Sequence, residues 1–418
     1  MSGVTETAAG AVRAPILTVL APFALVFGLC NYYRTVNAVL APYLIAALSL
    51  SAGELGLLIS VYFLVSALFQ APLGLLMDRY GPRRVQGVLI IIAAIGAVIF
   101  ALGRDWPTLL LGRTIMGIGA AGGLMTSLQA VTLWFPAPRW PIFNGLVMSI
   151  GTLGTLAATS PTQLLLDVTD WHTVLVGVAL LSFFGSALLF MAVPEKRRDG
   201  PPASLGEQLQ GMAAIYRDRL FWRFAPLYLS TTGSTMAFQS LWAGPWLHDV
   251  AQLEAQDVAN HLFVLTLLQI ASYFLIGWVA TELAKRNVPL VRMVIVGSAI
   301  YIATLMPLML PTGAGRWSVL LGIGLLSNVN TLCYPILSRH FPPAMTGRAT
   351  TALNSFFFIG AFIVQFMIGL LIDLIPATKP GHYPVPAYQL AFTAMIAIQL
   401  CGWLWCLVRP RSAAAPYE

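Results

Sequence analysis

The stretch that decides the fold is GLLMDRYGPRR, residues 74–84, where small, acidic and basic residues join two long apolar runs. The apolar runs cover residues 54–76 and 85–103. A helix needs about 20 apolar residues to cross about 30 Å of hydrocarbon, so each run is long enough to span a bilayer. Residues 74–84 are therefore expected to form a short loop between two membrane-spanning helices.

The composition of the whole chain agrees with this reading. Of its 418 residues, 58% are hydrophobic and only 9% are charged, against about 45–50% and about 25% in an ordinary globular protein. So few charges cannot cover a water-soluble surface, and an integral membrane protein is expected. The cysteines all lie in apolar stretches and are expected to be small buried hydrophobic residues rather than disulfide partners; they are Cys30, Cys333, Cys401 and Cys406.

Twelve apolar runs follow one another along the chain. They are predicted to be transmembrane helices at residues 16–47, 54–76, 85–103, 106–133, 140–166, 171–193, 220–247, 257–281, 288–310, 316–338, 347–375 and 387–408. The first run has no small-residue cleavage site behind it and is expected to be retained rather than removed as a signal peptide. The sequence thus predicts an all-α integral membrane protein with two pseudo-symmetric six-helix bundles, residues 1–193 and 220–418, joined by a cytoplasmic linker at 194–219.

The basic residues predict the orientation of the chain. Only Arg104, Arg316 and Lys379 fall in loops on one side, and Arg34 and Arg113 fall inside spans. The other side holds the remaining basic residues, which are Arg13, Arg79, Arg83, Arg84, Arg139, Lys196, Arg197, Arg198, Arg217, Arg219, Arg223, Lys285, Arg286, Arg292, Arg339, Arg348, Arg409 and Arg411. Because cytoplasmic loops are enriched in Lys and Arg, both termini are expected in the cytoplasm.

The two halves of the chain contain matching sequences at a nearly constant spacing. The matching segments are APYL at 41–44 and GPWL at 244–247, Gly74 to Arg83 and Gly277 to Arg286, Phe135-Pro136 and Phe341-Pro342, and LLLD at 164–167 and LLID at 370–373. Each pair occupies the same place relative to its span. Such an internal repeat predicts a transporter with its binding site near the middle of the membrane, which a channel or receptor would not require.

Residues 74–84 resemble the cytoplasmic signature of the major facilitator superfamily, G-x-x-x-D-R-x-G-R-R, with Pro82 in place of the first closing arginine. Arg113, Gly117 and Gly119 in the span 106–133 resemble that family's second signature. With the span count and the repeat, the resemblance extends over essentially the whole chain. It implies a secondary transporter that works by alternating access, in which the two halves rock around one central site.

Five residues of the stretch 74–84 are the candidate gating motif: Gly74, Asp78, Arg79, Gly81 and Arg83. Gly74 is expected to allow close helix approach, and Gly81 is expected to make the tight turn. Asp78 is expected to pair with a basic group or with a helix N-terminus. The arginines are expected to lock the cytoplasmic side; the alternative is that they only anchor the topology.

The span 140–166 carries three glycines, Gly145, Gly151 and Gly154, which are expected to be helix-packing positions. It lacks a Gly-Pro pair, and in the family resemblance this absence argues against a drug–proton antiporter.

The charges inside the predicted spans are positive. Every carboxylate falls outside the spans or at their ends, and among the histidines only His261 could enter one. Arg34 is expected to anchor a charged substrate, because its planar guanidinium suits bidentate contact with carboxylate or phosphate. The alternative is a structural arginine capped by carbonyl or hydroxyl groups. The candidate substrate-binding residues are Arg34, Asn31, Tyr33, Asn37, Arg113, Gln239, Trp242 and Asn330.

These observations predict a secondary active or facilitative transporter for a small anionic or zwitterionic organic solute, in the cytoplasmic (inner) membrane of a bacterium. Protons or a counter-substrate are candidate co-transported partners, and the lipid bilayer surrounds the chain. No nucleic acid, enzymatic activity, cofactor or bound metal is expected. Three alternatives stay open: a drug or metabolite exporter, a transition-metal (copper-type) transporter using soft Met and Cys ligands, and a non-transporting membrane sensor.

Overall fold

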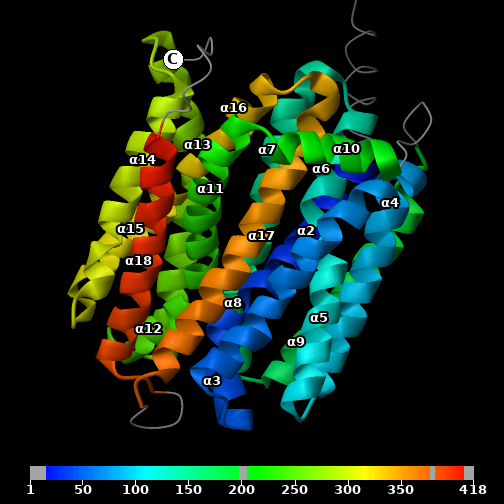
Figure 1. The fold of residues 1–418 in the computed structure, drawn as a ribbon. Coiled ribbons are helices and arrows are strands. Elements are labelled where there is room, and N and C mark those ends of the chain that lie inside the picture. Colours follow the sequence, from blue (N-terminus) through cyan, green and yellow to red (C-terminus); the bar gives the residue numbers. More distant parts are fainter. Residues whose placement is uncertain (1–15, 197–204, 377–381, 409–418) are drawn as a thin grey trace, which may run out of the picture. The chain divides into compact units, whose positions relative to one another are not determined.

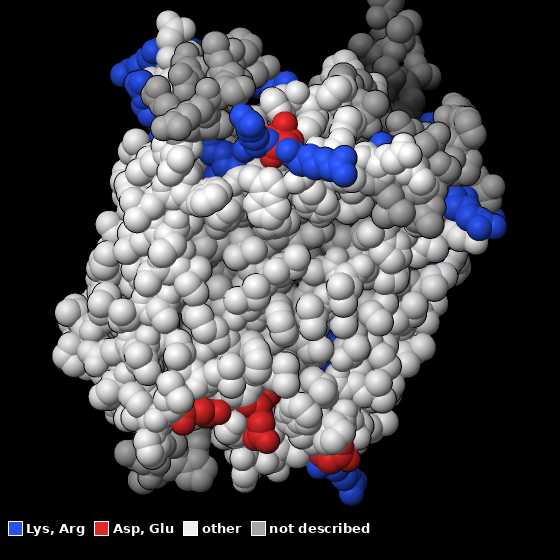
Figure 2. All heavy atoms as spheres, in the orientation of Figure 1, with Lys and Arg blue, Asp and Glu red and all other residues white. Residues whose placement is uncertain are grey.

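The computed structural model describes residues 16–196, 205–376 and 382–408, and in these ranges it is helical without a β-strand (Figure 1). Ten of the described helical segments are long and apolar enough to cross a membrane. Large apolar side chains such as Met191 and Phe274 are 86% and 67% exposed, as expected for a surface that faces lipid. On the face in Figure 2, Lys, Arg, Asp and Glu gather toward the top and bottom of the view, and the surface between them consists almost entirely of other residues. The all-α membrane fold predicted from the sequence is confirmed.

The chain forms two compact units. Among the described residues, the first contains residues 16–36 and 68–196, and the second contains residues 37–67, 205–376 and 382–408. The first unit holds the π-helix η1 (Ile16–Leu20), α2 (Ala21–Thr35), the second part of α4 (Ala52–Leu102), α5 (Trp106–Ala120), α6 (Gly123–Trp134), the 3-10 helix η2 (Ala137–Arg139), α7 (Trp140–Ala157), α8 (Ser160–Leu166) and α9 (Trp171–Ala192).

The second unit begins with α3 (Asn37–Leu48) and the first part of α4. Its remaining elements are α10 (Leu205–Tyr216), α11 (Arg219–Ala237), the π-helix η3 (Phe238–Trp242), α12 (Ala243–Asp249), α13 (Ala255–Lys285), α14 (Leu290–Thr304), η4 (Met306–Met309), η5 (Gly313–Gly315), α15 (Arg316–Leu326), η6 (Ser327–Leu332), α16 (Cys333–His340), α17 (Pro343–Asp373) and α18 (Val385–Leu407). The units are not simple halves of the chain, because residues 37–67 pack with the C-terminal residues.

Helical segments occupy all twelve predicted spans, and α4 alone covers two of them. The helix α10 lies within the predicted linker at 194–219. It forms because its apolar residues pack on its own unit: Ile215 is fully buried, and Gly211 lies against the side chain of Arg348 in α17. Some predicted features lie outside the described residues: the linker residues 197–204 and the charged residues Glu6, Arg13, Arg197, Arg198, Asp199, Lys379, Arg409, Arg411 and Glu418.

Gly81 makes the turn that the sequence predicted. It has φ 76° and ψ 160° inside α4, so α4 is two helical stretches that meet there at a kink. Non-glycine residues adopt this region of φ and ψ only at a cost of about 1–3 kcal/mol. A Cβ added at Gly81 would lie 3.5 Å from the carbonyl oxygen of Lys196, which is an ordinary van der Waals contact. The backbone conformation, rather than crowding, therefore requires glycine.

Close glycine contacts join one helix pair within each unit, α2 with α7 and α11 with α17. A Cβ at Gly154 in α7 would lie 1.8 Å from the carbonyl oxygen of Gly28 in α2. A Cβ at Gly360 in α17 would lie 2.3 Å from the carbonyl oxygen of Leu229 in α11. The two crossings occupy matching places in the sequence repeat. Backbones approach this closely only where side chains are absent.

The predicted packing role holds for two of the three glycines of the span 140–166. Gly154 meets Gly28, and a Cβ at Gly151 would lie 2.2 Å from the Phe27 ring. Gly145, in contrast, has no atom within 4 Å of its Cβ position in the described structure. The prediction for Gly145 was wrong because glycine spacing in a sequence does not show which helix face meets a neighbour.

The cysteines are free thiols, and Cys30, Cys333 and Cys406 are buried as expected. Cys401 is exposed, so its prediction as a buried residue was wrong. An apolar neighbourhood in the sequence does not separate core from exterior in a chain whose helices also expose apolar side chains.

Candidate functional site

The first unit contains both arginines of the predicted spans, Arg113 in α5 and Arg34 in α2. Arg113 in α5 is fully buried, and its Nη1 donates a hydrogen bond of 2.7 Å to the carbonyl oxygen of Tyr33 in α2. That carbonyl belongs to the peptide bond between Tyr33 and Arg34, and Arg34 is partly exposed. Arg113 thus binds the backbone of α2 directly before Arg34.

Polar side chains hold α2 in place near Arg34. Asn31 Nδ2 donates to the carbonyl oxygen of Gly151 in α7 at 2.9 Å. The Tyr33 hydroxyl lies 2.9 Å from the Ser182 hydroxyl in α9. Both predicted site residues are therefore engaged with neighbouring helices of the unit, where they position the backbone that carries Arg34.

The carboxylates that the structure describes lie at helix ends or, for Asp78, beside the kink in α4. Asp105 accepts a hydrogen bond from the Thr108 backbone N–H at 2.8 Å and caps α5. Asp170 caps α9 in the same way through Thr173. Each of these hydrogen bonds lowers the pKa of the carboxyl group below its usual value. The helices α2, α5, α7 and α9 contain no Asp or Glu, so the fixed charge along their lengths is positive.

The second unit contains a network of buried and partly buried amides around the π-helix η3. Gln239 Nε2 donates to Gln269 Oε1 in α13 at 2.7 Å. Asn328 in η6 donates through Nδ2 to the Gln269 carbonyl oxygen at 3.3 Å and to the Ser272 hydroxyl at 2.6 Å. The network therefore links η3, α13 and η6. Short π-helical segments inside longer helices occur frequently at functional sites.

Trp242 and Asn330 are buried but bond elsewhere in the second unit. Trp242 Nε1 donates to the carbonyl oxygen of Gln365 in α17 at 3.0 Å. Asn330 Oδ1 accepts from the Ser298 hydroxyl in α14 at 2.9 Å. Asn37, the first residue of α3, is buried and belongs to this unit rather than to the unit of Arg34. No described hydrogen bond joins these three residues to Gln239.

Gln365 is a buried polar residue that the sequence reading missed. Its Oε1 accepts from the Ser240 hydroxyl of η3 at 2.8 Å, and its backbone accepts from Trp242. A single glutamine inside the apolar segment FIVQFMIG, residues 362–369, was the available signal. Buried amides in apolar helices need hydrogen-bond partners and so mark helix contacts or binding groups.

The candidate gating motif connects α4 to the end of α9. Arg83 Nη2 donates to the Phe190 carbonyl oxygen at 2.5 Å, and Arg84 Nη2 lies 2.7 Å from Glu195 Oε2. Arg79 is exposed, with its guanidinium 5.3 Å from the centre of the Tyr80 ring. Gly74 and Asp78 lie in α4 before the kink and are both partly buried.

A helix N-terminus is bound by a carboxylate in the second unit. Asp373, the last residue of α17, accepts from the backbone N–H groups of Ala52 at 2.9 Å and Gly53 at 2.7 Å. This contact places a negative charge at the positive end of the α4 dipole. The sequence reading expected such a contact of Asp78 and treated Asp373 only as part of the repeat.

Residues 23–365 match the model of the Major Facilitator Superfamily. The chain belongs to this family. The resemblance that the sequence motifs indicated is thereby confirmed, and this superfamily member is a multi-pass integral membrane transporter of small solutes.

Curated relatives of this superfamily member are distant but extend over most of its length. It is 24% identical to a nitrite extrusion protein of Bacillus subtilis, over 85% of this chain and 86% of the relative. It is 22% identical to a probable sulfoacetate transporter of Cupriavidus necator, over 85% of this chain and 86% of the relative. A probable L-galactonate transporter of Escherichia coli is 21% identical over 78% of this chain and 76% of the relative.

Solved structures share the superfamily fold with this chain. A bacterial homologue of the human lysosomal transporter Spinster, in an inward-facing and unoccupied conformation, matches with a TM-score of 0.72 at 17% identity over 93% of this chain and 95% of that one. A D-xylose–proton symporter matches with a TM-score of 0.69 at 16% identity, over 93% of this chain and 97% of the symporter.

Proposed function

We propose that this transporter carries a small organic anion or zwitterion across the cytoplasmic membrane of a bacterium by alternating access, with both termini in the cytoplasm. The observation that supports this most is the hydrogen bond from fully buried Arg113 to the Tyr33 carbonyl oxygen, which directly precedes partly exposed Arg34 in α2. The relatives named for nitrite, sulfoacetate and L-galactonate are all named for anions, which favours the same substrate charge.

The physical basis of the proposal is the cost of positive charge in a low-dielectric surrounding. Placing a guanidinium at the centre of a transmembrane helix costs about 2.5–3.5 kcal/mol on insertion scales. An anionic substrate would bring a compensating charge to Arg34, and a planar guanidinium can bind a carboxylate through two parallel hydrogen bonds. Because α2, α5, α7 and α9 contain no carboxylate, we expect exchange, facilitated diffusion, or cotransport in which substrate and proton together satisfy an arginine.

The remaining candidates are proposed to bind neutral polar groups of the solute. In the first unit these are Asn31 and Tyr33. In the second unit they are Asn37, Gln239, Trp242 and Asn330. The best supported among them is Gln239, because it lies on a π-helical segment and joins a network of amides whose hydrogen bonds can be exchanged for substrate hydrogen bonds.

The experiment that tests the proposal compares Arg34→Lys and Arg34→Ala with the wild type in a substrate-binding assay on purified protein. A hydrogen bond to a charged group contributes about 1.5–3 kcal/mol, which is roughly 10- to 150-fold in affinity. We expect both variants to lose affinity, with the larger loss in Arg34→Ala, while thermal unfolding stays unchanged. Normal binding with lowered thermal stability would instead make Arg34 a structural residue.

The motif at 74–84 is proposed to control the change between conformations. We expect Asp78→Asn and Arg79→Ala to lower the transport rate without lowering the amount of protein in the membrane. Arg79 is exposed and therefore dispensable for packing, so a loss of rate in Arg79→Ala would report on gating. Transport in proteoliposomes measures the rate, and equal transport by both variants and the wild type would leave only the topology-anchor role.

A further inference from the structure

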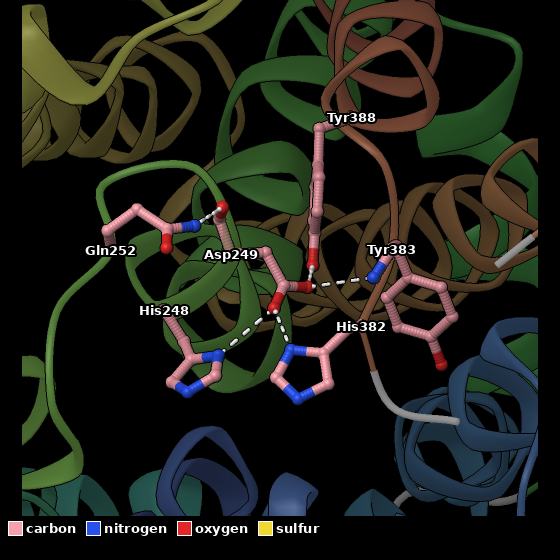
Figure 3. A network of polar contacts seen from close by, with 6 residues as sticks. All are labelled: His248, Asp249, Gln252, His382, Tyr383 and Tyr388. Atoms are coloured by element: carbon pink, nitrogen blue, oxygen red, sulfur yellow. Dashed lines mark hydrogen bonds and ion pairs between the residues drawn. The ribbon is translucent and has the colours of Figure 1, made fainter. Parts of the chain in front are cut away.

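Two histidines converge on one carboxylate at the C-terminal end of α12 (Figure 3). His248 and Asp249 are the last residues of α12, and His382 lies in the segment before α18. The Nδ1 atoms of His248 and His382 lie 3.0 Å and 3.2 Å from Asp249 Oδ1. One ligand atom from each residue can be chosen so that all three lie within 4.8 Å of one another.

The Asp249 carboxylate is fixed by its own partners. Its side chain is only 3% exposed, and Oδ2 accepts from the Tyr383 backbone N–H at 3.1 Å and from the Tyr388 hydroxyl at 2.7 Å. These contacts direct Oδ1 toward the two imidazoles, as Figure 3 shows. Gln252 also donates to the Asp249 backbone carbonyl and holds the turn after α12.

We propose that His248, Asp249 and His382 form a binding site for a divalent transition-metal ion of the Zn²⁺ class. Zinc binds imidazole nitrogen and carboxylate oxygen at about 2.0–2.2 Å in tetrahedral geometry, which places ligand atoms about 3.3 Å apart. The two nitrogen–oxygen distances of 3.0 and 3.2 Å are close to this value. Each imidazole would bind through Nδ1 in its neutral form, with the proton on Nε2.

The surroundings of the cluster match those of a metal centre with an open position. The His248 and His382 side chains are 41% and 51% exposed, so an ion can enter from solvent and a water molecule can complete the tetrahedron. Tyr388 and the Tyr383 backbone occupy the place of outer-shell partners that orient a ligating carboxylate. A bound ion would fix the end of α12 to the segment before α18, both within the second unit. The proposal is independent of the transported solute.

The test uses full-length protein without a histidine tag, stripped with chelator and dialysed into chelator-free buffer. Titration with Co²⁺, followed by its visible absorption, reports the number of sites and their geometry, and displacement by Zn²⁺ gives the zinc affinity. We expect one ion per chain with the spectrum of a four-coordinate site. His248→Ala and His382→Ala should each weaken binding by more than about 100-fold, beyond the 10- to 100-fold typical of an outer-shell loss.

Two further variants separate a metal site from loss of folding. His261→Ala removes a histidine that stacks on Trp317, outside the cluster, and should bind the ion normally. Tyr388→Phe keeps all three ligands and should weaken binding by about 10- to 100-fold. Thermal unfolding without metal checks that each variant folds. With Zn²⁺ the unfolding temperature should rise as much in His261→Ala as in the wild type, and less in Tyr388→Phe. Failure of the wild type to bind Co²⁺ or Zn²⁺, or equal binding by His382→Ala, would overturn the proposal and leave two histidines hydrogen-bonded to a carboxylate.

Discussion

Gly154→Ala is expected to destabilise the first unit more than any other single-methyl change in it. The added Cβ would lie 1.8 Å from the carbonyl oxygen of Gly28, so α2 and α7 would have to move apart. Overpacking a well-packed core usually costs about 1–3 kcal/mol, and because the clash here is with backbone rather than with a flexible side chain, we expect more than about 3 kcal/mol. Thermal unfolding in detergent measures the effect.

The matched control is Gly145→Ala in the same helix, α7. Its Cβ would meet no described atom within 4 Å, and replacing glycine by alanine in a helix favours folding by up to about 1 kcal/mol. We expect wild-type or slightly higher stability. Equal unfolding temperatures for Gly154→Ala and Gly145→Ala would contradict the close crossing of α2 and α7.

Arg113→Met is expected to abolish transport, because it removes the buried charge while keeping most of the side-chain volume. It also removes the hydrogen bond to the Tyr33 carbonyl oxygen, and a hydrogen bond from a charged group contributes about 1.5–3 kcal/mol. Arg113→Lys keeps the charge without the planar fork, so we expect partial transport with weaker substrate affinity. Transport and thermal unfolding should be measured on the same preparations.

The control for losing a buried polar side chain is Gln399→Met in α18. Gln399 is fully buried, and neither its Oε1 nor its Nε2 has a hydrogen-bond partner in the described part of the chain. We expect unchanged transport and no loss of stability, since removing an unsatisfied polar group is neutral or favourable. Wild-type transport by Arg113→Met would remove this arginine from the substrate site.

The spans, the repeat and the signature loop could be read from the sequence because each depends on a local pattern. The length of an apolar run predicts a transmembrane helix. A glycine in a short polar loop predicts a turn, and Gly81 has the positive φ that such a turn requires. The repeat in the sequence also appears as two matching helix crossings, at Gly154 and at Gly360. These features depend on residues close together in the chain or on matched positions.

Features that depend on contacts between distant segments were not predictable in the same way. Asp373 caps the N-terminus of α4, more than three hundred residues earlier in the chain. Gln365 meets η3 through a contact that no local pattern reports. The same limit applies to His382, which joins Asp249 only after folding. Arg113 and Arg34 stand out in the sequence by their charge, but the bond from Arg113 to the backbone beside Arg34 is a tertiary contact.

The measurement that tests the anionic-substrate proposal most directly is uptake into proteoliposomes of organic acids paired with their neutral amides. Each pair has nearly the same size and shape and differs in charge, so the ratio of the two uptake rates reports the role of charge. The positive charges of Arg113 and Arg34 predict that transported solutes are anions or zwitterions. Each is expected to be preferred over its amide by at least about tenfold, or about 1.4 kcal/mol. Uptake of neutral or cationic solutes at the rate of the anions would contradict it.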